Sequence, residues 1–391
     1  MTVLTIGDIG VVSGMMHIGD EAMFEAARDE LAARGVDIVG VSSAPAESER
    51  RYGVAMVPRL GFAGMDRAAS QARLEELTDA AAGRGRLAAG DPAERVLAAL
   101  DRVSGVLNAG GGNLASRWPV HIYERSALVA MARARGLPVV VTGQTFGPDL
   151  EHGDEERVAS LVRAAALTSV RESVSGALVR SWGLPVVEGV DDASFLGWRS
   201  PAATGGTSGA VVVSLSGWFA GRSAPDLEQR MAELVDHAAR TVGPVVFHAH
   251  FGPWGPGEEP AGDAALHERV RARMTETSRV LPTGDSVPAA ALARSARLLI
   301  TSRYHPAVFA APAGVPVVAL AADDYTRIKL SGALAHWDQS EVQDLDALPA
   351  SAVDRADAGR DATSAAARER LEGLRSAAAR WWDDVAGVLA G

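Results

Sequence analysis

The sequence predicts an α/β fold built from two Rossmann-like, doubly wound domains. Short apolar, β-branched runs alternate with segments rich in Ala, Arg and Glu, and this alternation stops once and then restarts. The 391 residues also exceed the ~250 to 300 at which a single hydrophobic core stops growing. We therefore expect two parallel sheets with helical crossovers, in domains that face each other across a cleft, and a long C-terminal helix.

The expected elements follow this alternation in order. Strands are predicted in the first half at residues 3–6, 36–41, 103–107, 139–142, 167–170 and 185–187, and in the second half at 211–215, 245–250, 298–301 and 317–320. Helical composition separates them, notably at 60–98, 226–240 and 363–389. Residues 198–209 have the composition of a linker. Domains are therefore predicted at 1–199 and 210–391, with the linker at 200–209.

Composition and charge exclude several classes of protein. Hydrophobic residues at 47% and charged residues at 22% are typical of a globular chain, and a net charge of 38 − 49 = −11 disfavours nucleic acid or an anionic membrane as partner. The lack of cysteine excludes disulfides, thiolate nucleophiles and cysteine-ligated metals. No stretch approaches the ~20 apolar residues of a membrane span, and the N-terminus resembles a first strand more than a signal peptide. We expect a cytoplasmic location and no membrane span.

Glycine-rich segments follow several predicted strands. The loop at 7–22 does not have Gly-x-Gly-x-x-Gly spacing, and Asp20 and Glu21 would repel an anion, so a structural or acceptor-sugar loop is favoured over phosphate binding. Three consecutive glycines at 110–112 leave backbone bare, which favours a ligand there, with a tight turn as the alternative. The segment at 143–148 adds Gln and Thr donors at a third strand end.

Basic and titratable side chains also cluster at predicted strand ends. Arg171 offers a bidentate fork to a carboxylate or phosphate, with an ion pair to a neighbouring acid as the alternative. Arg303, Tyr304 and His305 stand together after a strand, which favours a functional role over a structural one. Lys329 is the single lysine of the chain and is expected in the loop after a strand, so it is a candidate for ligand binding rather than a chance surface residue.

Two histidines end another predicted strand. His248 and His250 alternate with one residue between them, which places both rings on one face, as in some metal sites. No acid is fixed in position to complete a ligand set, so we favour cleft lining, with His250 at the rim, and predict no metal site.

Taken together, these motifs resemble the polysaccharide pyruvyl transferase family over about residues 1–335 and in the same order. The stretches that carry the resemblance are His17-Ile18-Gly19-Asp20-Glu21-Ala22, Gly110-Gly111-Gly112, 143–148, Arg171-Glu172-Ser173-Val174-Ser175, Asp192-Ala193-Ser194-Phe195, Ser302-Arg303-Tyr304-His305, Phe309-Ala310, Gly314-Val315-Pro316 and 325–329. His17 stands where the family usually has Asn, and the final Tyr-to-Lys spacing is one residue longer.

The resemblance implies a two-domain frame like that of GT-B glycosyltransferases, phosphoenolpyruvate as donor, a sugar or glycan acceptor, and no further cofactor. Phosphoenolpyruvate carries a carboxylate and a phosphate, so a chain of charge −11 needs local positive charge to bind it. An imidazole with a pKa near ~6.5 suits acid–base work on the enol carbon and the acceptor hydroxyls. By similarity to the family, Arg303 and His305 are donor-site residues and Arg171 is a second anion clamp. With the chemistry above, we predict Arg303, His305 and Lys329 as the catalytic residues. The further donor-binding residues are Arg171, Gly110, Gly111, Gly112 and Gln144, and the acceptor-binding residues are His17, Asp20, Asn113 and His250.

Two other functions remain open from the sequence. A nucleotide-sugar glycosyltransferase or epimerase on the same frame would use Arg303 and Lys329 to hold a diphosphate and His17 as base. A binding paralogue would keep the cleft without turnover. Protection by a nucleotide sugar but not by phosphoenolpyruvate would favour the first, and tight binding without phosphate release the second.

Overall fold

The chain forms two compact units in a computed structural model that describes residues 1–151, 153–198, 209–254 and 259–391. Unit 1 consists of Met1–Gly10, Met23–Asp192 and Ser376–Gly391, and unit 2 of Val11–Ala22 and Ala193–Arg375. The predicted ranges place residues 11–22 and 193–198 in the first domain and residues 376–391 in the second, whereas 11–22 and 193–198 lie in unit 2 and 376–391 lie in unit 1. Apart from Gly209, the predicted linker at 200–209 lies outside the described residues.

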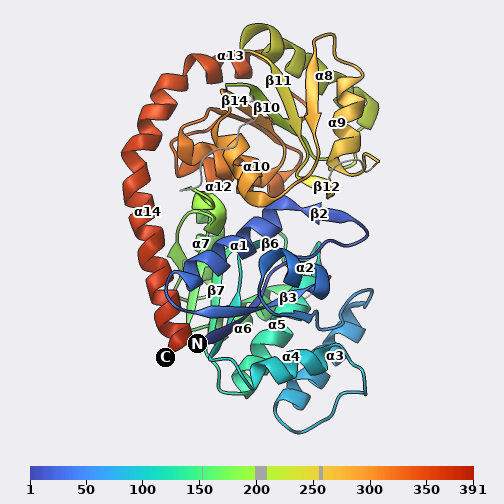
Figure 1. The fold of residues 1–391 in the computed structure, drawn as a ribbon, viewed down its shortest axis with the longest axis vertical. Coiled ribbons are helices and arrows are strands. Elements are labelled where there is room, and N and C mark those ends of the chain that lie inside the picture. Colours follow the sequence, from blue (N-terminus) through green and yellow to red (C-terminus); the bar gives the residue numbers. More distant parts are fainter. Residues whose placement is uncertain (152, 199–208, 255–258) are drawn as a thin grey trace. The chain divides into compact units, whose positions relative to one another are not determined.

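Unit 1 is built on a parallel sheet with strand order β4-β3-β1-β5-β7-β8-β9, in which β6 also pairs with β7 (Figure 1). Its strands are β1 (Thr2–Ile6), β3 (Asp37–Ser42), β4 (Met56–Pro58), β5 (Gly105–Asn108), β6 (Gly111–Leu114), β7 (Val139–Phe146), β8 (Leu167–Val170) and β9 (Val187–Glu188). Its helices are α2 (Pro45–Tyr52), α3 (Arg67–Ala81), α4 (Ala93–Leu100), α5 (Pro119–Ala134), α6 (Asp154–Ala164), α7 (Ser173–Ser181) and most of α1 (Ile18–Ala32). The strand order reverses between β1 and β5, as in a doubly wound fold.

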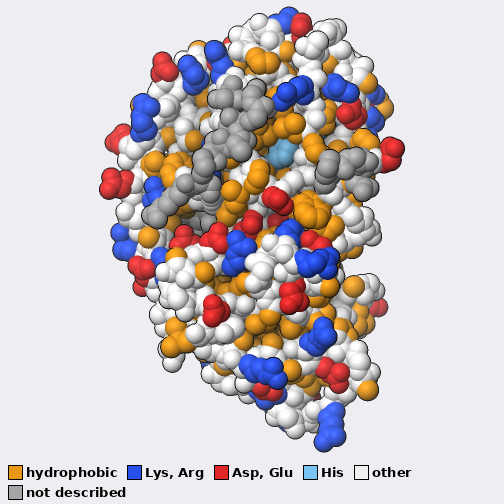
Figure 2. All heavy atoms as spheres, viewed as in Figure 1, with side chains coloured by type: hydrophobic (Ala, Val, Ile, Leu, Met, Phe, Trp, Pro, Cys, Tyr) orange, Lys and Arg blue, Asp and Glu red, His pale blue; other side chains and the backbone are white. Residues whose placement is uncertain are grey.

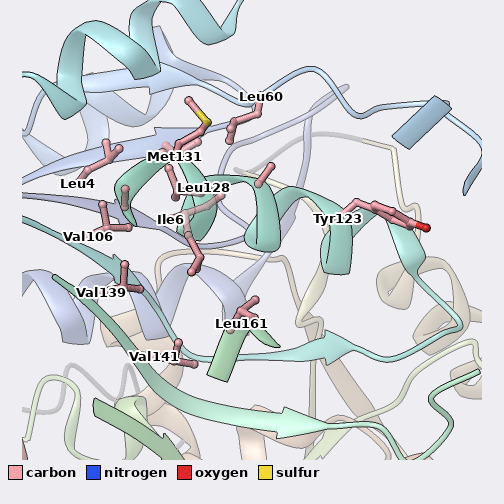
Figure 3. Packing of buried hydrophobic residues seen from close by; sticks show 14 of the residues in the cluster. Leu4, Ile6, Leu60, Val106, Tyr123, Leu128, Met131, Val139, Val141 and Leu161 are labelled. Atoms are coloured by element: carbon pink, nitrogen blue, oxygen red, sulfur yellow. The ribbon is translucent and has the colours of Figure 1, made fainter. Parts of the chain in front are cut away.

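Successive residues of the central strands of unit 1 enter opposite layers of core. Leu4 and Ile6 of β1 pack with the layer that contains Leu128 and Met131 of α5 (Figure 3), whereas Val3 packs with the layer on the other face. That second layer also contains residues of α1 and of the last turns of α14 (Arg360–Ala390), among them Leu31, Trp382, Val385 and Leu389. Burial on both faces explains why these strands are continuous apolar runs in the sequence.

Unit 2 contains a second parallel sheet, with strand order β13-β11-β10-β14-β15-β16, and a separate antiparallel pair of β2 (Met15–His17) and β12 (Phe251–Pro253). The sheet strands are β10 (Val211–Ser214), β11 (Val245–His248), β13 (Ser278–Leu281), β14 (Leu298–Thr301), β15 (Val317–Ala321) and β16 (Val342–Asp344). The helices are α8 (Ala224–Thr241), α9 (Asp263–Arg271), α10 (Ser286–Arg294), α11 (Tyr304–Ala310), α12 (Asp324–Ala335) and α13 (Ala350–Ala358). Here the order reverses between β10 and β14.

The predicted α/β class, with two doubly wound parallel sheets and a long C-terminal helix, is confirmed. One local prediction was wrong: Lys329 lies on helix α12 and not in the loop after a strand. The side chain of Asp323 accepts from the backbone of Thr326 and the Thr326 hydroxyl bonds the backbone of Asp323, a reciprocal cap that starts the helix at Asp324. Within the described residues, no helix is long and apolar enough to cross a membrane.

Charged side chains of both signs are interspersed on one face of the protein (Figure 2). On the face drawn in Figure 2, Lys and Arg side chains lie among Asp and Glu side chains, with hydrophobic ones between them. Many arginines are paired with acids, as Arg51 is with Glu47 one turn away on α2. Positive charge for an anionic ligand must therefore come from particular side chains rather than from a broad basic surface.

Candidate functional site

The strand order of unit 2 indicates where a ligand would bind. Doubly wound sheets bind ligands outside the carboxyl ends of their strands, at the point where the strand order reverses. In unit 2 this point lies between β10 and β14, and a hydrogen bond from the backbone N–H of Ser216 to the Ser302 hydroxyl (2.7 Å) joins the loops that follow these two strands. The loop after β14 ends at the predicted residue Arg303, and His305 follows in the first turn of α11.

A buried carboxylate holds Arg303 in a fixed orientation. Nε and Nη2 of Arg303 donate to the two oxygens of Asp263, at 2.8 and 2.5 Å, and Asp263 Oδ2 also accepts from the backbone N–H of Phe251 (2.9 Å). The Arg303 side chain is 23% exposed, and its Nη1 makes no hydrogen bond to the described residues. One edge of the guanidinium is therefore occupied by Asp263, and the edge formed by Nη1 and Nη2 remains for a ligand.

His305 lies against the backbone of Gly19. A Cβ atom built on Gly19 would lie 1.9 Å from Nδ1 of His305, so a side chain at this position would collide with the ring. The half-buried ring also lies edge-on to Tyr304 and near Phe309, with centroids 5.1 and 6.0 Å away. Glycine in the first turn of α1 is thus explained by the close approach of the imidazole.

Lys329 contacts two tyrosines of unit 2. Its ammonium donates to the hydroxyl of Tyr325 (3.0 Å) and lies 4.1 Å from the centroid of that ring and 5.4 Å from the centroid of Tyr304. Helical spacing explains the first contact, because residues four apart lie on the same face of α12. The Tyr304 ring therefore links Lys329 to the start of α11, where Arg303 and His305 lie.

The predicted acceptor residues near the N-terminus also belong to unit 2. His17 is exposed, pairs with Phe251 in the β2–β12 ladder and stacks on its ring, with centroids 4.1 Å apart. The backbone N–H of Ile18 donates to the carbonyl of His250 (2.9 Å), and Asp20 is half-buried in the first turn of α1. The segment after β1 is therefore a structural part of the same strand-end region as Arg303.

Three buried imidazoles lie behind this region. The rings of His248 and His250 meet edge-to-face, 5.0 Å apart, and His267 Nε2 accepts from the backbone N–H of Leu215 (2.9 Å). Burial lowers the pKa of His248 to about 4 and of His267 to about 3, and burial, followed by the neighbouring imidazoles and Arg303, holds the pKa of His250 well below its usual range. All three are therefore neutral near pH 7. Among the described residues, no group of three or more His, Asp or Glu side chains could hold a metal.

In unit 1, Arg171 is buried in an ion pair. Its Nη1 donates to Asp191 Oδ2 (2.8 Å), its Nε donates to the Thr145 hydroxyl (2.9 Å), and Met23 lies beside it. The Arg171 and Asp191 side chains are almost completely buried. The ion pair that the sequence left open as the alternative is thus present, and the charge of Arg171 is offset locally.

A carboxylate of the protein lies against the predicted glycine turn. Cβ atoms built on Gly110 and Gly143 would lie 3.0 and 2.5 Å from Asp192 Oδ2, an atom buried without a hydrogen-bond partner among the described residues. Asp192 Oδ1 accepts from Thr142 (2.9 Å). Burial, and then the neighbouring Asp191, raise the pKa of Asp192 to about 7. The group that lies on bare backbone at Gly110 is therefore the side chain of Asp192.

The side chain of Gln144 contacts the rest of the glycine turn at 110–112. Its Nε2 donates to the carbonyl of Ala109 (2.6 Å), and its Oε1 has no hydrogen-bond partner among the described residues. A Cβ atom on Gly111 would lie 3.3 Å from this Oε1 and 3.4 Å from Oδ1 of Asn113, and Gly112 follows in β6. Two amide oxygens therefore converge beside Gly111.

A charged network that the sequence did not predict follows β1 in unit 1. Asp8 Oδ1 contacts Arg59 Nη1 (2.7 Å), Arg125 Nη2 (2.9 Å) and His121 Nδ1 (3.3 Å), and Glu124 bridges both arginines. Burial would raise the pKa of Asp8, but Arg125, His121 and Arg59 together hold it well below its usual range. Asp8 therefore stays ionised at neutral pH.

Sequence comparison decides the family. The family model described as polysaccharide pyruvyl transferase matches residues 17–324. The chain belongs to this family. The protein is therefore an enzyme of the polysaccharide pyruvyl transferase family. The matched range includes the strand-end residues described above for both units, apart from Asp8 and Lys329, and it does not include the first residues of the chain. A search among curated proteins finds no match.

Solved structures of sugar enzymes share the fold of this pyruvyl transferase family member. The UDP-GlcNAc 2-epimerase from Neisseria meningitidis, bound to UDP-GlcNAc, has a TM-score of 0.60 at 12% identity, with all of both chains covered. A putative UDP-N-acetylglucosamine 2-epimerase from Listeria monocytogenes has 0.60 at 11%, covering 94% of this chain and 90% of its own. A glycosyltransferase from Rickettsia africae has 0.55 at 11%, with 98% of each chain covered. At these identities the likeness is one of fold.

The structure distributes the predicted residues between the two units. Unit 2 brings together His17, Asp20, His250, Arg303, His305 and Lys329, whereas Gly110, Gly111, Gly112, Asn113, Gln144 and Arg171 lie in unit 1. Sequence reasoning did not identify Asp263, Trp218 or Asp192 as site residues. Of these three, only Asp192 could have been identified from the sequence, because it begins one of the stretches that resemble the family.

Proposed function

We propose that this enzyme transfers the pyruvyl group of phosphoenolpyruvate to two hydroxyls of a sugar or glycan acceptor, with release of phosphate. The observation that carries the proposal is the position of Arg303 and His305 at the start of α11, at the reversal of strand order in unit 2, with Lys329 one contact away through Tyr304. Membership of the pyruvyl transferase family supports it. No redox cofactor is needed, and the cytoplasm is the proposed compartment.

Arg303 is proposed to bind an anionic group of the donor through its Nη1–Nη2 edge. Asp263 occupies the other edge and fixes the plane of the guanidinium, so little side-chain entropy is lost when the donor binds. Because Asp263 also offsets the charge of Arg303, further positive charge is needed for a carboxylate and a phosphate. Lys329 is the proposed source.

His305 is proposed as the acid and base of the reaction. Protonation of the enol carbon converts the CH₂ group to a methyl and leaves an oxocarbenium-like centre at C2, which the first acceptor oxygen attacks as its proton departs. The second oxygen then replaces phosphate at C2, and its proton leaves with the phosphate. The proton of the first hydroxyl thus replaces the proton that the imidazole delivers to carbon, so one imidazole can act first as acid and then as base. The contact with Gly19 keeps the ring in place.

Phosphate release tests the proposal. Wild-type enzyme is incubated with phosphoenolpyruvate and a panel of free, nucleotide-linked and lipid-linked sugars, and we expect release with at least one acceptor. His305→Gln should lower turnover by roughly 10² to 10⁴ while donor binding stays similar. Stabilisation by a nucleotide sugar, with none by phosphoenolpyruvate, would instead indicate a nucleotide-sugar transferase or epimerase. Tight donor binding without release across the panel would indicate a binding paralogue.

A further inference from the structure

Trp218 exposes an aromatic ring at the reversal of strand order in unit 2. It lies in the loop after β10, and 48% of the residue is exposed. Burial of a side chain this large stabilises a fold by roughly 2 to 3 kcal/mol, so an exposed indole forgoes part of that stabilisation. The proposed steps of donor binding and proton transfer do not use it.

The exposure of Trp218 does not result from a loosely held loop. The next residue, Phe219, is buried in the core of unit 2. Nη1 of Arg222 donates to the carbonyls of Ala322 (2.7 Å) and Phe219 (3.3 Å), which closes the loop. Ala220 has a φ of 50°, a conformation that costs a residue with a Cβ roughly 1 to 2 kcal/mol. The loop is therefore held in a conformation that directs Trp218 outward.

The indole also has a defined neighbour across the sheet. Nε1 of Trp218 donates to Oδ2 of Asp323 (2.9 Å), which follows β15. Because β14 lies between β10 and β15, this bond joins the loops on either side of the strand that leads to Arg303 and His305. The ring is thus fixed at the strand ends that carry the proposed catalytic residues.

We propose that Trp218 is the stacking surface for the pyranose ring of the acceptor, with the Asp323 carboxylate beside it to accept sugar hydroxyls. This inference rests on the proposed function and deepens it. One face of a pyranose presents C–H groups that pack on an indole, and its edge presents hydroxyl donors.

Charge argues for a neutral sugar rather than an anion at this position. Asp323 and the exposed Asp324 place two carboxylates at the start of α12, next to the indole. They would repel the carboxylate and phosphate of the donor, and equally a diphosphate. The donor is therefore bound near Arg303, and the sugar hydroxyls are bound near Asp323 and Asp324.

Saturation-transfer NMR with methyl pyranosides of glucose, galactose, mannose and N-acetylglucosamine tests the inference, because it detects weak binding and does not require turnover. We expect transfer to the C–H protons of one pyranoside face in wild type, a signal weaker by about fivefold or more in Trp218→Ala, and partial retention in Trp218→Phe. Trp254→Ala is the matched control, since Trp254 is 39% exposed and bonds Asp285 in the same way. Its signal should equal that of wild type.

Separate outcomes overturn the inference and the proposed function. A pyranoside signal that survives in Trp218→Ala, or the lack of any pyranoside signal in wild type, overturns the stacking role. A signal from UDP that Trp218→Ala abolishes, without one from the pyranosides, also overturns it, because the occupant would then not be a sugar ring. Failure of wild type to bind phosphoenolpyruvate in calorimetry counts against the proposed function alone. Donor affinity should be the same in Trp218→Ala and wild type.

Discussion

Asp263 holds Arg303 by both of its carboxylate oxygens, from a position 40 residues earlier in the chain. The same carboxylate accepts from the backbone of Phe251, whose ring lies 5.7 Å from the guanidinium and stacks on His17. A single buried acid therefore sets the orientation of the proposed donor clamp and fixes the strand that carries the aromatic partner of His17. If Asp263 acts by orienting Arg303, its loss should weaken donor binding, whereas if it acts through its negative charge, its loss should strengthen donor binding.

Asp263→Asn separates these two effects. If Asp263 mattered through its charge, its removal would strengthen the binding of an anionic donor. Because we assign it a positioning role, we expect the KM for phosphoenolpyruvate to rise about tenfold, with a smaller change in kcat. Asp101→Asn, which removes the exposed partner of Arg135, is the control and should leave both constants unchanged. Tighter donor binding in Asp263→Asn would refute the positioning role.

Arg303→Lys tests the geometry of the clamp itself. Lysine keeps the positive charge but loses the planar fork, so donor affinity should fall by roughly one to two decades, or ~1.5 to 3 kcal/mol. Calorimetry with phosphoenolpyruvate measures this affinity. Arg297→Lys, at another arginine that pairs with one carboxylate through two nitrogens, should bind the donor like wild type. Equal affinities in all three proteins would remove Arg303 from the donor site.

The sequence predicted the sheets better than the details at their edges. The strands at 167–170 and 298–301 agree with β8 and β14 because they are apolar runs buried on both faces. Several short strands were missed, namely β2, β4, β6, β12, β13 and β16. Some of them contain Pro or Gly, and all of them are strands because a neighbouring strand pairs with them. Local pattern carries no information on such pairing.

The same limit applies to the candidate site. Arg303 and His305 could be found because strand-end position and residue type are both local features. Asp263 lies in a helix start that looks ordinary in the sequence, and only the folded chain places it against Arg303. Trp218 likewise follows an unremarkable Ser-Gly pair, and its exposure depends on contacts from Ala322 and Asp323. Partners distant in sequence cannot be read from a motif.

Gly19→Ala should impair catalysis through His305. Alanine is better than glycine within a helix by roughly 0.5 to 1 kcal/mol, so helix propensity alone predicts a neutral or stabilising change. The new Cβ would lie 1.9 Å from His305 Nδ1, so the ring must move, and a displacement of about 1 Å can cost about 10² in turnover. Gly373→Ala, at a helical glycine with open space around it, is the control and should keep full activity. Wild-type turnover in Gly19→Ala would count against the role of His305.

Chemical modification of Lys329 provides an independent test of the donor site. Since the chain contains one lysine, acylation has two possible targets, Lys329 and the N-terminal amine, which mass spectrometry distinguishes. We expect inactivation to follow the modification of Lys329 and phosphoenolpyruvate to protect it more than a nucleotide sugar does. Lys329→Arg, which resists acylation, should make the remaining activity insensitive to the reagent. Full activity after complete modification would place Lys329 outside the donor site.

The buried imidazoles predict a loss of stability in weak acid. Burial lowers the pKa of His248 to about 4 and of His267 to about 3, whereas an imidazole in the unfolded chain titrates near ~6.5. Between these values the unfolded state binds more protons than the folded state, so the free energy of unfolding increases with pH in this window. Each imidazole therefore contributes a loss of stability that grows as the pH falls from about 6.5 towards about 4, on the order of 3 kcal/mol per imidazole. Asp192, whose pKa is raised to about 7, contributes in the opposite direction over the same range, so the contribution of an imidazole is measured by comparing a variant with wild type.

Denaturant unfolding at several pH values measures this dependence. His267→Gln keeps an acceptor for the backbone N–H of Leu215 and removes the titrating ring. The stability of the variant should therefore fall less steeply than that of wild type between about pH 6.5 and about pH 4. Its stability at neutral pH can be lower, because the ring packs near Phe247. The comparison therefore uses the slope with pH and not the absolute stability. Equal slopes for the two proteins would mean that His267 is not the group that resists protonation in the folded enzyme.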